Sequence, residues 1–129
     1  MTPPTHRPYI LSVDDEPVNQ LLVTSFLKSR YELAFANNGM ECLESVEHRR
    51  PDLILMDIHM PELDGLEACR QIRLNPANRH IPIIFVSTST LEKDRQKSLN
   101  VGGSDYMHKP FNLKALNSKI AYYLKNSSH

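Results

Sequence analysis

Five residues whose side chains suit metal or phosphoryl chemistry follow short apolar runs of the sequence. Asp14 and Asp15 close "YILSVDD", Asp57 closes "DLILMD", Ser87 closes "IIFVS" and Lys109 closes "SDYMHK". Carboxylates gathered at one place repel one another and raise each other's pKa unless a cation lies between them. Oxygen ligands of this kind suit a hard ion, Mg²⁺ or Mn²⁺. Such an ion lets acids hold a phosphoryl group, whose charge they would otherwise reject.

The apolar runs themselves predict the strands of a sheet, because they are short and are separated by turn residues and by segments with helical spacing. In the first helical segment, Pro17 suits the first turn, and Val18, Leu21, Leu22 and Phe26 form one apolar stripe. The predicted strands are residues 9–14, 32–36, 52–57, 83–87 and 104–109. The predicted helices are residues 17–29, a segment ending near residue 49, a segment around 66–72, residues 91–101 and about 112–125.

Strand and helix therefore alternate along the chain, which is typical of an α/β fold. Near-continuous apolar strands indicate a parallel sheet with helices on both faces. In such a sheet, sites form beyond the carboxyl ends of the strands, so the five candidate residues should meet in one pocket. Each alone has a simpler explanation: a helix cap for an acid, a satisfied hydroxyl for Ser87 and a surface position for Lys109. Together, at the ends of four strands, they favour a site.

The composition limits the class of protein. The 129 residues fit one domain, in which 15 Lys plus Arg balance 15 Asp plus Glu. A neutral chain carries no electrostatic signature of nucleic-acid or anionic-membrane binding, and no apolar run suits a membrane span or a secretory signal. Cys42 and Cys69, far apart in sequence, suit core thiols in a reducing compartment, so we expect a cytoplasmic protein. We expect residues 1–7 to be a flexible lead-in, 8–125 the domain and 126–129 a tail.

Four motifs resemble the receiver domain of two-component response regulators, the CheY-like family. They are "VDDEPVNQ", "DLILMDIHMPELDGLE", "IPIIFVS" and "GGSDYMHKPF", in the family's order and spacing. The resemblance covers residues 8–125 and implies a flavodoxin-like (βα)5 three-layer sandwich with a five-stranded parallel sheet in the order 2-1-3-4-5. It also implies a phosphorelay signalling switch that catalyses only its own phosphotransfer and dephosphorylation, rather than an enzyme acting on external substrates.

The resemblance assigns the metal and the phosphoryl group to particular positions. Asp57 would accept a phosphoryl group from a phosphohistidine of a histidine kinase or histidine phosphotransfer protein. Asp15, Asp57 and the backbone carbonyl of His59 would bind Mg²⁺ directly, and Asp14 would act mostly through a metal-bound water. Mn²⁺ is the alternative ion, and no other cofactor is implied.

The same resemblance implies a conformational switch. Ser87 would donate a hydrogen bond to one phosphoryl oxygen, and Lys109, joined to Pro110 by a cis peptide bond, would pair with another. Tyr106 would turn inward as Ser87 moves toward the phosphate. The face between the fourth and fifth helices would then signal to an output domain or a partner protein. The sequence leaves open the cognate kinase, the pathway, the output, the lifetime of the phosphoryl group, a homodimer through that face and whether the chain is a piece of a longer protein.

Three alternatives compete with this interpretation. A phosphatase of the haloacid dehalogenase type also has an Asp nucleophile after an apolar strand, but its D-x-D motif needs an acid where this chain has His59. A flavodoxin-like cofactor site needs a glycine- and hydroxyl-rich loop where this chain has "DDEP". A degenerate receiver that only binds partners is disfavoured by the intact set of acids, hydroxyl and lysine. One departure from the family pattern is Thr88, beside the pocket, where the family more often has Ala or Gly.

Overall fold

The computed structural model describes residues 7–89, 91–110 and 112–126, and residues 1–6 and 127–129, most of the predicted lead-in and tail, lie outside the described part. Its strands are β1 (Tyr9–Val13), β2 (Glu32–Ala36), β3 (Leu53–Asp57), β4 (Ile83–Ser87) and β5 (Asp105–His108). All neighbouring strands pair in parallel, in the order β2-β1-β3-β4-β5. The predicted 2-1-3-4-5 order is therefore confirmed.

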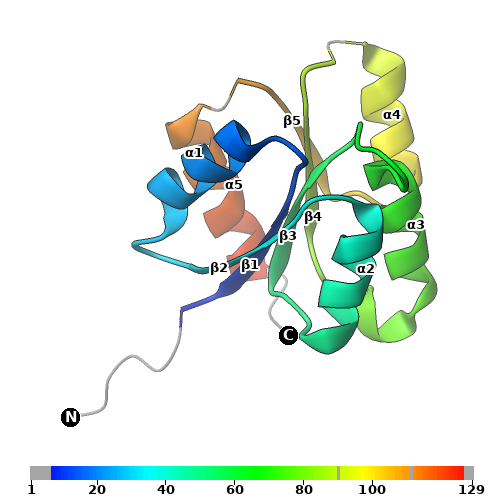
Figure 1. Ribbon diagram of the computed structural model, residues 1–129, viewed down its shortest axis with the longest axis horizontal. Coiled ribbons are helices and arrows are strands. Elements are labelled where there is room, and N and C mark those ends of the chain that lie inside the picture. Colours follow the sequence, from blue (N-terminus) through cyan, green and yellow to red (C-terminus); the bar gives the residue numbers. More distant parts are fainter. Residues whose placement is uncertain (1–6, 90, 111, 127–129) are drawn as a thin grey trace.

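The helices are α1 (Pro17–Leu27), α2 (Gly39–His48), α3 (Gly65–Leu74), α4 (Glu92–Asn100) and α5 (Leu113–Asn126), with a short 3-10 helix, η1, at Pro76–Asn78. Helices α1 and α5 lie on one side of the sheet, and α2, α3 and α4 lie on the other (Figure 1). This arrangement is the predicted three-layer sandwich.

The three central strands are buried on both faces. Every residue of β1, β3 and β4 is buried, which explains why their sequences run almost continuously apolar. Successive side chains point to opposite faces, so Leu11 and Ile54 join the core cluster beneath α2 and α3, whereas Ile10 and Leu55 join the cluster beneath α1 and α5. Because a core cluster packs against each face of the central strands, the carboxyl ends of these strands are held in fixed positions.

Helix α1 is turned differently from the prediction. The expected buried stripe included Val18, Leu21 and Leu22, but these side chains are 66%, 69% and 37% exposed. The buried residues of the helix are Val23 and Leu27. Apolar side chains at three consecutive positions, 21 to 23, point in different directions around a helix, so their spacing alone does not decide which side faces the sheet. The predicted stripe is therefore wrong at these three positions, whereas its fourth member, Phe26, packs against the core cluster beneath α1 and α5, and the helix itself is present.

The start of α3 lies unusually close to the end of β3. The Asp64 side chain caps the helix by accepting the backbone N–H of Glu67 at 2.9 Å. A Cβ at Gly65 would overlap the carbonyl oxygen of Asp57. The approach of α3 to the last residue of β3 therefore requires glycine at this position.

The two cysteines belong to the core cluster beneath α2 and α3. Both are buried free thiols, as predicted. Burial raises the pKa of Cys42 to about 12 and that of Cys69 to about 11, which keeps both thiols protonated and unreactive. No helix in the described part of the chain is long and apolar enough to cross a membrane.

Candidate functional site

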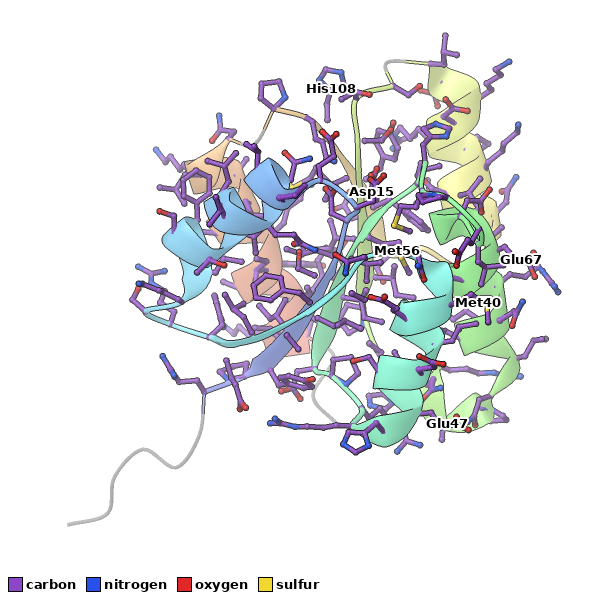
Figure 2. All side chains as sticks on the ribbon, in the orientation of Figure 1. Asp15, Met40, Glu47, Met56, Glu67 and His108 are labelled. Atoms are coloured by element: carbon purple, nitrogen blue, oxygen red, sulfur yellow. The ribbon has the colours of Figure 1, made fainter. Side chains whose placement is uncertain are left out.

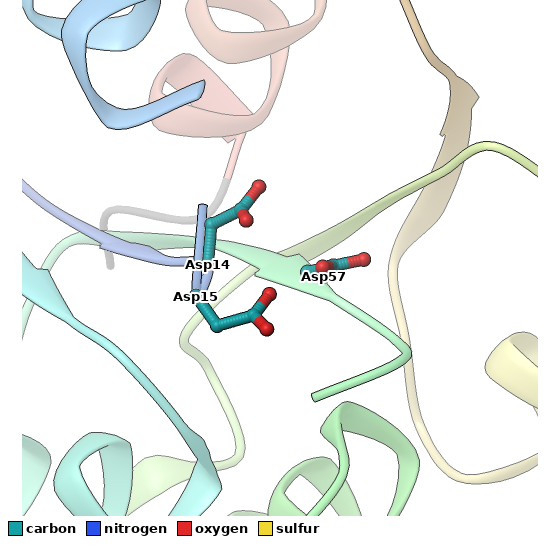
Figure 3. A group of neighbouring side chains, drawn as sticks. All are labelled: Asp14, Asp15 and Asp57. Carbon is teal, nitrogen blue, oxygen red and sulfur yellow. The ribbon is translucent and has the colours of Figure 1, made fainter. Parts of the chain in front are cut away.

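Three carboxylates meet at the carboxyl edge of the sheet. Strands β1 and β3 pair with Val13 beside Met56, so Asp14 and Asp57 leave neighbouring strand ends. Asp15 follows directly on Asp14. One carboxylate oxygen from each of the three acids lies within 4.8 Å of the other two (Figure 3). The acids that the sequence placed at different strand ends therefore converge.

Lys109 places its ammonium group between two of these acids. Its Nζ lies 2.7 Å from Asp14 Oδ2 and 3.7 Å from Asp57 Oδ2. All three residues are buried, with 8%, 5% and 8% exposure for Lys109, Asp14 and Asp57. The peptide bond from Lys109 to Pro110 is cis, as the resemblance implied. The Lys109 backbone N–H donates to the Ser87 carbonyl at 2.7 Å, which fixes the end of β5 beside the end of β4.

The Asp57 carboxyl is the group whose ionisation the site changes most clearly. Burial, which disfavours the charged form, is the largest cause and raises the pKa of Asp57 to about 6. The negative charges of Asp14 and Asp15 act in the same direction, while Lys109 opposes them. Asp57 is therefore ionised at neutral pH, but in surroundings that hold more negative charge than Lys109 offsets. A divalent cation would relieve this excess.

Asp14 and Asp15 are held differently. Asp14 Oδ1 accepts the backbone N–H of Glu16 at 2.9 Å and Asp14 Oδ2 accepts from Lys109 Nζ, so both oxygens of this carboxylate are engaged. The Asp15 side chain is exposed and points toward the same space (Figure 3). Asp15 therefore offers a cation a more accessible oxygen than Asp14 does.

The loop after β4 connects Ser87 with Tyr106. Ser87 is fully buried, and its Oγ accepts the backbone N–H of Ser89 at 3.1 Å. The Tyr106 hydroxyl donates to the Ser89 carbonyl at 2.8 Å, and its half-buried ring packs against the core cluster beneath α2 and α3. Tyr106 thus faces inward and holds the loop that begins at Ser87.

Two side chains outside the acid cluster contact the backbone of the site. His108 Nε2 lies 2.9 Å from the carbonyl oxygen of Thr88, the residue after Ser87. Figure 2 shows His108 above Asp15 in the view. Gln20, on α1, donates to the carbonyl oxygen of Asp14. Bonds from a side chain to a distant carbonyl leave no periodic pattern, so the sequence carried no signal for either contact.

The chemistry of the donor set fits a hard divalent cation. Among the described residues, Asp14, Asp15 and Asp57 form the group of potential metal ligands close enough to share one ion. All of its donor atoms are carboxylate oxygens, which suit Mg²⁺ or Mn²⁺ better than a softer metal. His59 is exposed, and its side chain is not needed for this set.

Comparison with known proteins explains the arrangement. The sequence model of the family described as "Response regulator receiver domain" matches residues 10–121. The chain belongs to this family. Its five-stranded parallel sheet is that of a receiver domain of two-component signalling, and the acid cluster is consistent with this family.

Similar receiver sequences occur within longer proteins. This receiver domain is 37% identical over 117 residues to a "Probable cyclic di-GMP phosphodiesterase" of Vibrio cholerae, covering 91% of this chain and 26% of that protein. It is 38% identical over 119 residues to "Response regulator MprA" of Mycobacterium leprae, covering 92% of this chain and 51% of that protein. The chain thus spans about half or less of these relatives.

A solved receiver domain supports the interpretation of the acid cluster. The receiver domain of the sensor histidine kinase PA1611 from Pseudomonas aeruginosa matches this one with a TM-score of 0.87 and 36% identity, covering 93% of this chain and 99% of that one. That structure has a magnesium ion coordinated in its active site cleft.

Proposed function

We propose that this receiver domain accepts a phosphoryl group on Asp57 from a phosphohistidine, in a reaction that requires Mg²⁺. The observation that carries the proposal is the meeting of three carboxylates and a buried lysine around the end of β3. A carboxylate is a weak nucleophile, but phosphoryl transfer depends mainly on alignment and on neutralising charge. This site offers both.

The chain's own residues account for the ligands of the metal. Asp15 and Asp57 would bind Mg²⁺ directly, together with the backbone carbonyl of His59, and Asp14 would act through water. The engagement of both Asp14 oxygens and the accessibility of Asp15 support this division. When bound, the ion supplies positive charge against the phosphoryl oxygens. Mn²⁺ would fit the same oxygen set.

The transfer is an in-line displacement at phosphorus. A carboxylate oxygen of Asp57, ionised above its pKa of about 6, forms a new P–O bond. The P–N bond to the donor histidine breaks, and its electron pair passes to the imidazole nitrogen, which takes up a proton from water. Lys109, whose Nζ lies 3.7 Å from Asp57 Oδ2, pairs with one phosphoryl oxygen. The Ser87 hydroxyl donates to another.

The product would change the loop after β4 and the face beyond it. The phosphoryl group would place about two negative charges and three acceptor oxygens beside Ser87 and Lys109, where the Asp57 carboxylate had carried one charge. Ser87 is linked through Ser89 to Tyr106, so its movement would be passed to this ring. Among the described residues of α4, only Ser98 is buried, so the helix is weakly anchored. We propose that the face formed by α4, β5 and α5 carries the signal to an output domain or partner, with phosphate biasing two arrangements.

The phosphodonor would be a histidine kinase or a histidine phosphotransfer protein. The exposed side chains of Val18, Leu21 and Leu22 support docking on α1, because this helix begins two residues after Asp15 and its outer face is apolar. An apolar surface of this kind suits another protein better than water.

We place the protein in the cytoplasm, as a switch that catalyses only its own phosphotransfer and dephosphorylation.

The proposal is tested with a small-molecule phosphodonor. The wild type, Asp57→Asn and Asp64→Asn are incubated with acetyl phosphate, with and without Mg²⁺, and analysed by intact mass. Asp64 is an exposed helix cap in the same loop region and serves as the matched control. We expect the wild type and Asp64→Asn to gain one phosphoryl group only when Mg²⁺ is present, and Asp57→Asn to gain none. Equal modification of Asp57→Asn and the wild type would refute Asp57 as the acceptor.

A further inference from the structure

The side chain of Gln20 forms four hydrogen bonds close to the consecutive acids Asp14 and Asp15, called here the acid pair. Its Nε2 donates to the carbonyl oxygens of Asp14 at 3.0 Å, Ser12 at 3.2 Å and Ala36 at 3.3 Å. Its Oε1 accepts the hydroxyl proton of Ser12 at 2.8 Å. One side chain of α1 thereby joins the carboxyl ends of β1 and β2.

The location explains why these bonds matter. The Asp14 backbone N–H donates to the Ala36 carbonyl at 3.0 Å, and beyond this bond the chain leaves the sheet to enter α1. Carbonyl groups at such a strand end need partners, because leaving a buried one unpaired destabilises the folded state. A carboxamide can donate to carbonyls and accept from a hydroxyl at the same time. Glutamine suits the position because both kinds of partner are present.

The bond to Asp14 also fixes the direction of the acids. The Asp14 carbonyl belongs to the planar peptide group that joins Asp14 to Asp15. Holding this oxygen restricts the backbone rotations on either side of the peptide group, and these rotations aim both Cα–Cβ bonds. At the side chain of Asp14, Lys109 Nζ donates to the carboxylate at 2.7 Å. The acid pair is therefore held through its backbone by Gln20 and through its side chain by Lys109.

We propose that Gln20 is a positioning residue of the phosphorylation pocket, which holds the Asp14–Asp15 peptide so that both carboxylates face Asp57. This inference rests on the proposed function, since it concerns the site where Mg²⁺ and the phosphoryl group would bind. Gln20 touches neither of them and acts through the backbone of the acids. The outer face of the same helix carries Leu21 and Leu22, so α1 would join the donor surface to the metal ligands.

The test compares Mg²⁺ affinity with stability. The variants are Gln20→Met, which keeps the length of the side chain without its hydrogen bonds, and Gln20→Ala, a second variant in case the first does not fold. Methionine is preferred to glutamate because an added negative charge would itself attract the ion. The control is Val23→Ala, which removes buried side-chain volume from the same helix, on a residue in the core cluster beneath α1 and α5. The Mg²⁺ dissociation constant is measured by calorimetry or NMR titration, and stability by urea unfolding without metal.

We expect Gln20→Met to raise the Mg²⁺ dissociation constant about tenfold, the size of effect seen when groups that orient metal ligands are lost. Val23→Ala should lower the stability at least as much while changing the dissociation constant less than about twofold, because large-to-small core changes act on folding rather than on the ligands. A Gln20 variant that binds Mg²⁺ as tightly as the wild type would overturn this inference but leave the proposed function standing. Equal weakening in the Val23 control would also overturn it. A wild type that fails to bind Mg²⁺ at millimolar concentration would overturn the proposed function, and this inference with it.

Discussion

Replacing Asp57 by asparagine should stabilise the metal-free protein at neutral pH. Asp57 is 8% exposed, and burial is the main reason that its pKa rises from 3.8 to about 6. Above that pH the folded protein must hold a carboxylate that would be better solvated in the unfolded chain. Asparagine has nearly the same shape and carries no charge, so the variant avoids this cost.

The sign and size of the effect follow from proton linkage. Between pH 3.8 and about 6 the folded state binds more protons at Asp57 than the unfolded state does. The contribution of this group to stability is therefore complete below pH 3.8 and is lost as the pH rises through about 6. A difference of about two pKa units corresponds to about 3 kcal/mol. For a domain of this size, that free energy shifts the melting temperature by about 10 °C.

The assay is urea unfolding followed by circular dichroism, in chelator, at several values between about pH 4 and pH 8. The free energy of unfolding of Asp57→Asn should match that of the wild type at about pH 4 and exceed it by up to about 3 kcal/mol at about pH 8. Mg²⁺ should narrow the gap, because the ion stabilises the protein that binds it more tightly. The control is Glu44→Gln, which removes an exposed carboxylate from α2. A variant no more stable than the wild type at about pH 8, or a gap that does not change with pH, would refute the reasoning.

Three further substitutions test other parts of the account. Gly65→Ala should lower the free energy of unfolding by about 2 kcal/mol or more and impair phosphorylation, because its Cβ would overlap the Asp57 carbonyl. Urea unfolding and intact mass measure the two effects, and a variant that matches the wild type in both would contradict the close approach of α3 to the end of β3. Tyr106→Phe removes the hydroxyl bond to the Ser89 carbonyl, so we expect a loss of about 1 kcal/mol and faster amide exchange in the loop after β4, with phosphorylation retained; unchanged exchange would count against Tyr106 as the anchor of the loop. Lys109→Met removes the cation that lowers the pKa of Asp57, so NMR titration of the Asp57 carboxyl carbon should show a further rise of this pKa, and acetyl phosphate should no longer modify the protein. An unchanged titration would exclude an ion pair between Lys109 and Asp57.

The sheet could be predicted from sequence because its central strands are buried on both faces. Continuous apolar runs mark β1, β3 and β4, and the polar residues that end them mark the edge where the site forms. Predicted bounds agree with the observed ones within one or two residues where Pro17 or the Gly102–Gly103 pair interrupts the pattern. The resemblance to receiver domains added the strand order, which spacing alone does not contain.

The orientation of α1 could not be predicted in the same way. Leu21, Leu22 and Val23 offer apolar side chains in several directions, and only Val23 is buried. The side of the helix that faces the sheet also carries Gln20, a polar residue whose partners are carbonyl groups at the ends of β1 and β2. A pattern of apolar residues does not register such a contact, because its partners are backbone atoms brought near by the fold.

The acids and lysine of the site could be predicted because each is covalently next to a recognisable strand. Asp57 ends β3, and Lys109 follows β5 by one residue. The contact of His108 could not be predicted, because its ring reaches across to the Thr88 carbonyl from the neighbouring strand and the register of β4 with β5 decides this contact. The sequence therefore indicates which residues reach the site edge, while the packing decides which of them hold its loops.

The most direct test of the central claim is a crystal structure of the protein with Mg²⁺ and beryllofluoride, which mimics a phosphoryl group on a carboxylate. We expect an ion bound by Asp15, Asp57 and the carbonyl of His59, and a beryllofluoride group on Asp57 contacted by Ser87 and Lys109. A complex in which the ion lies away from these acids, or in which the fluoride group binds another side chain, would contradict the account.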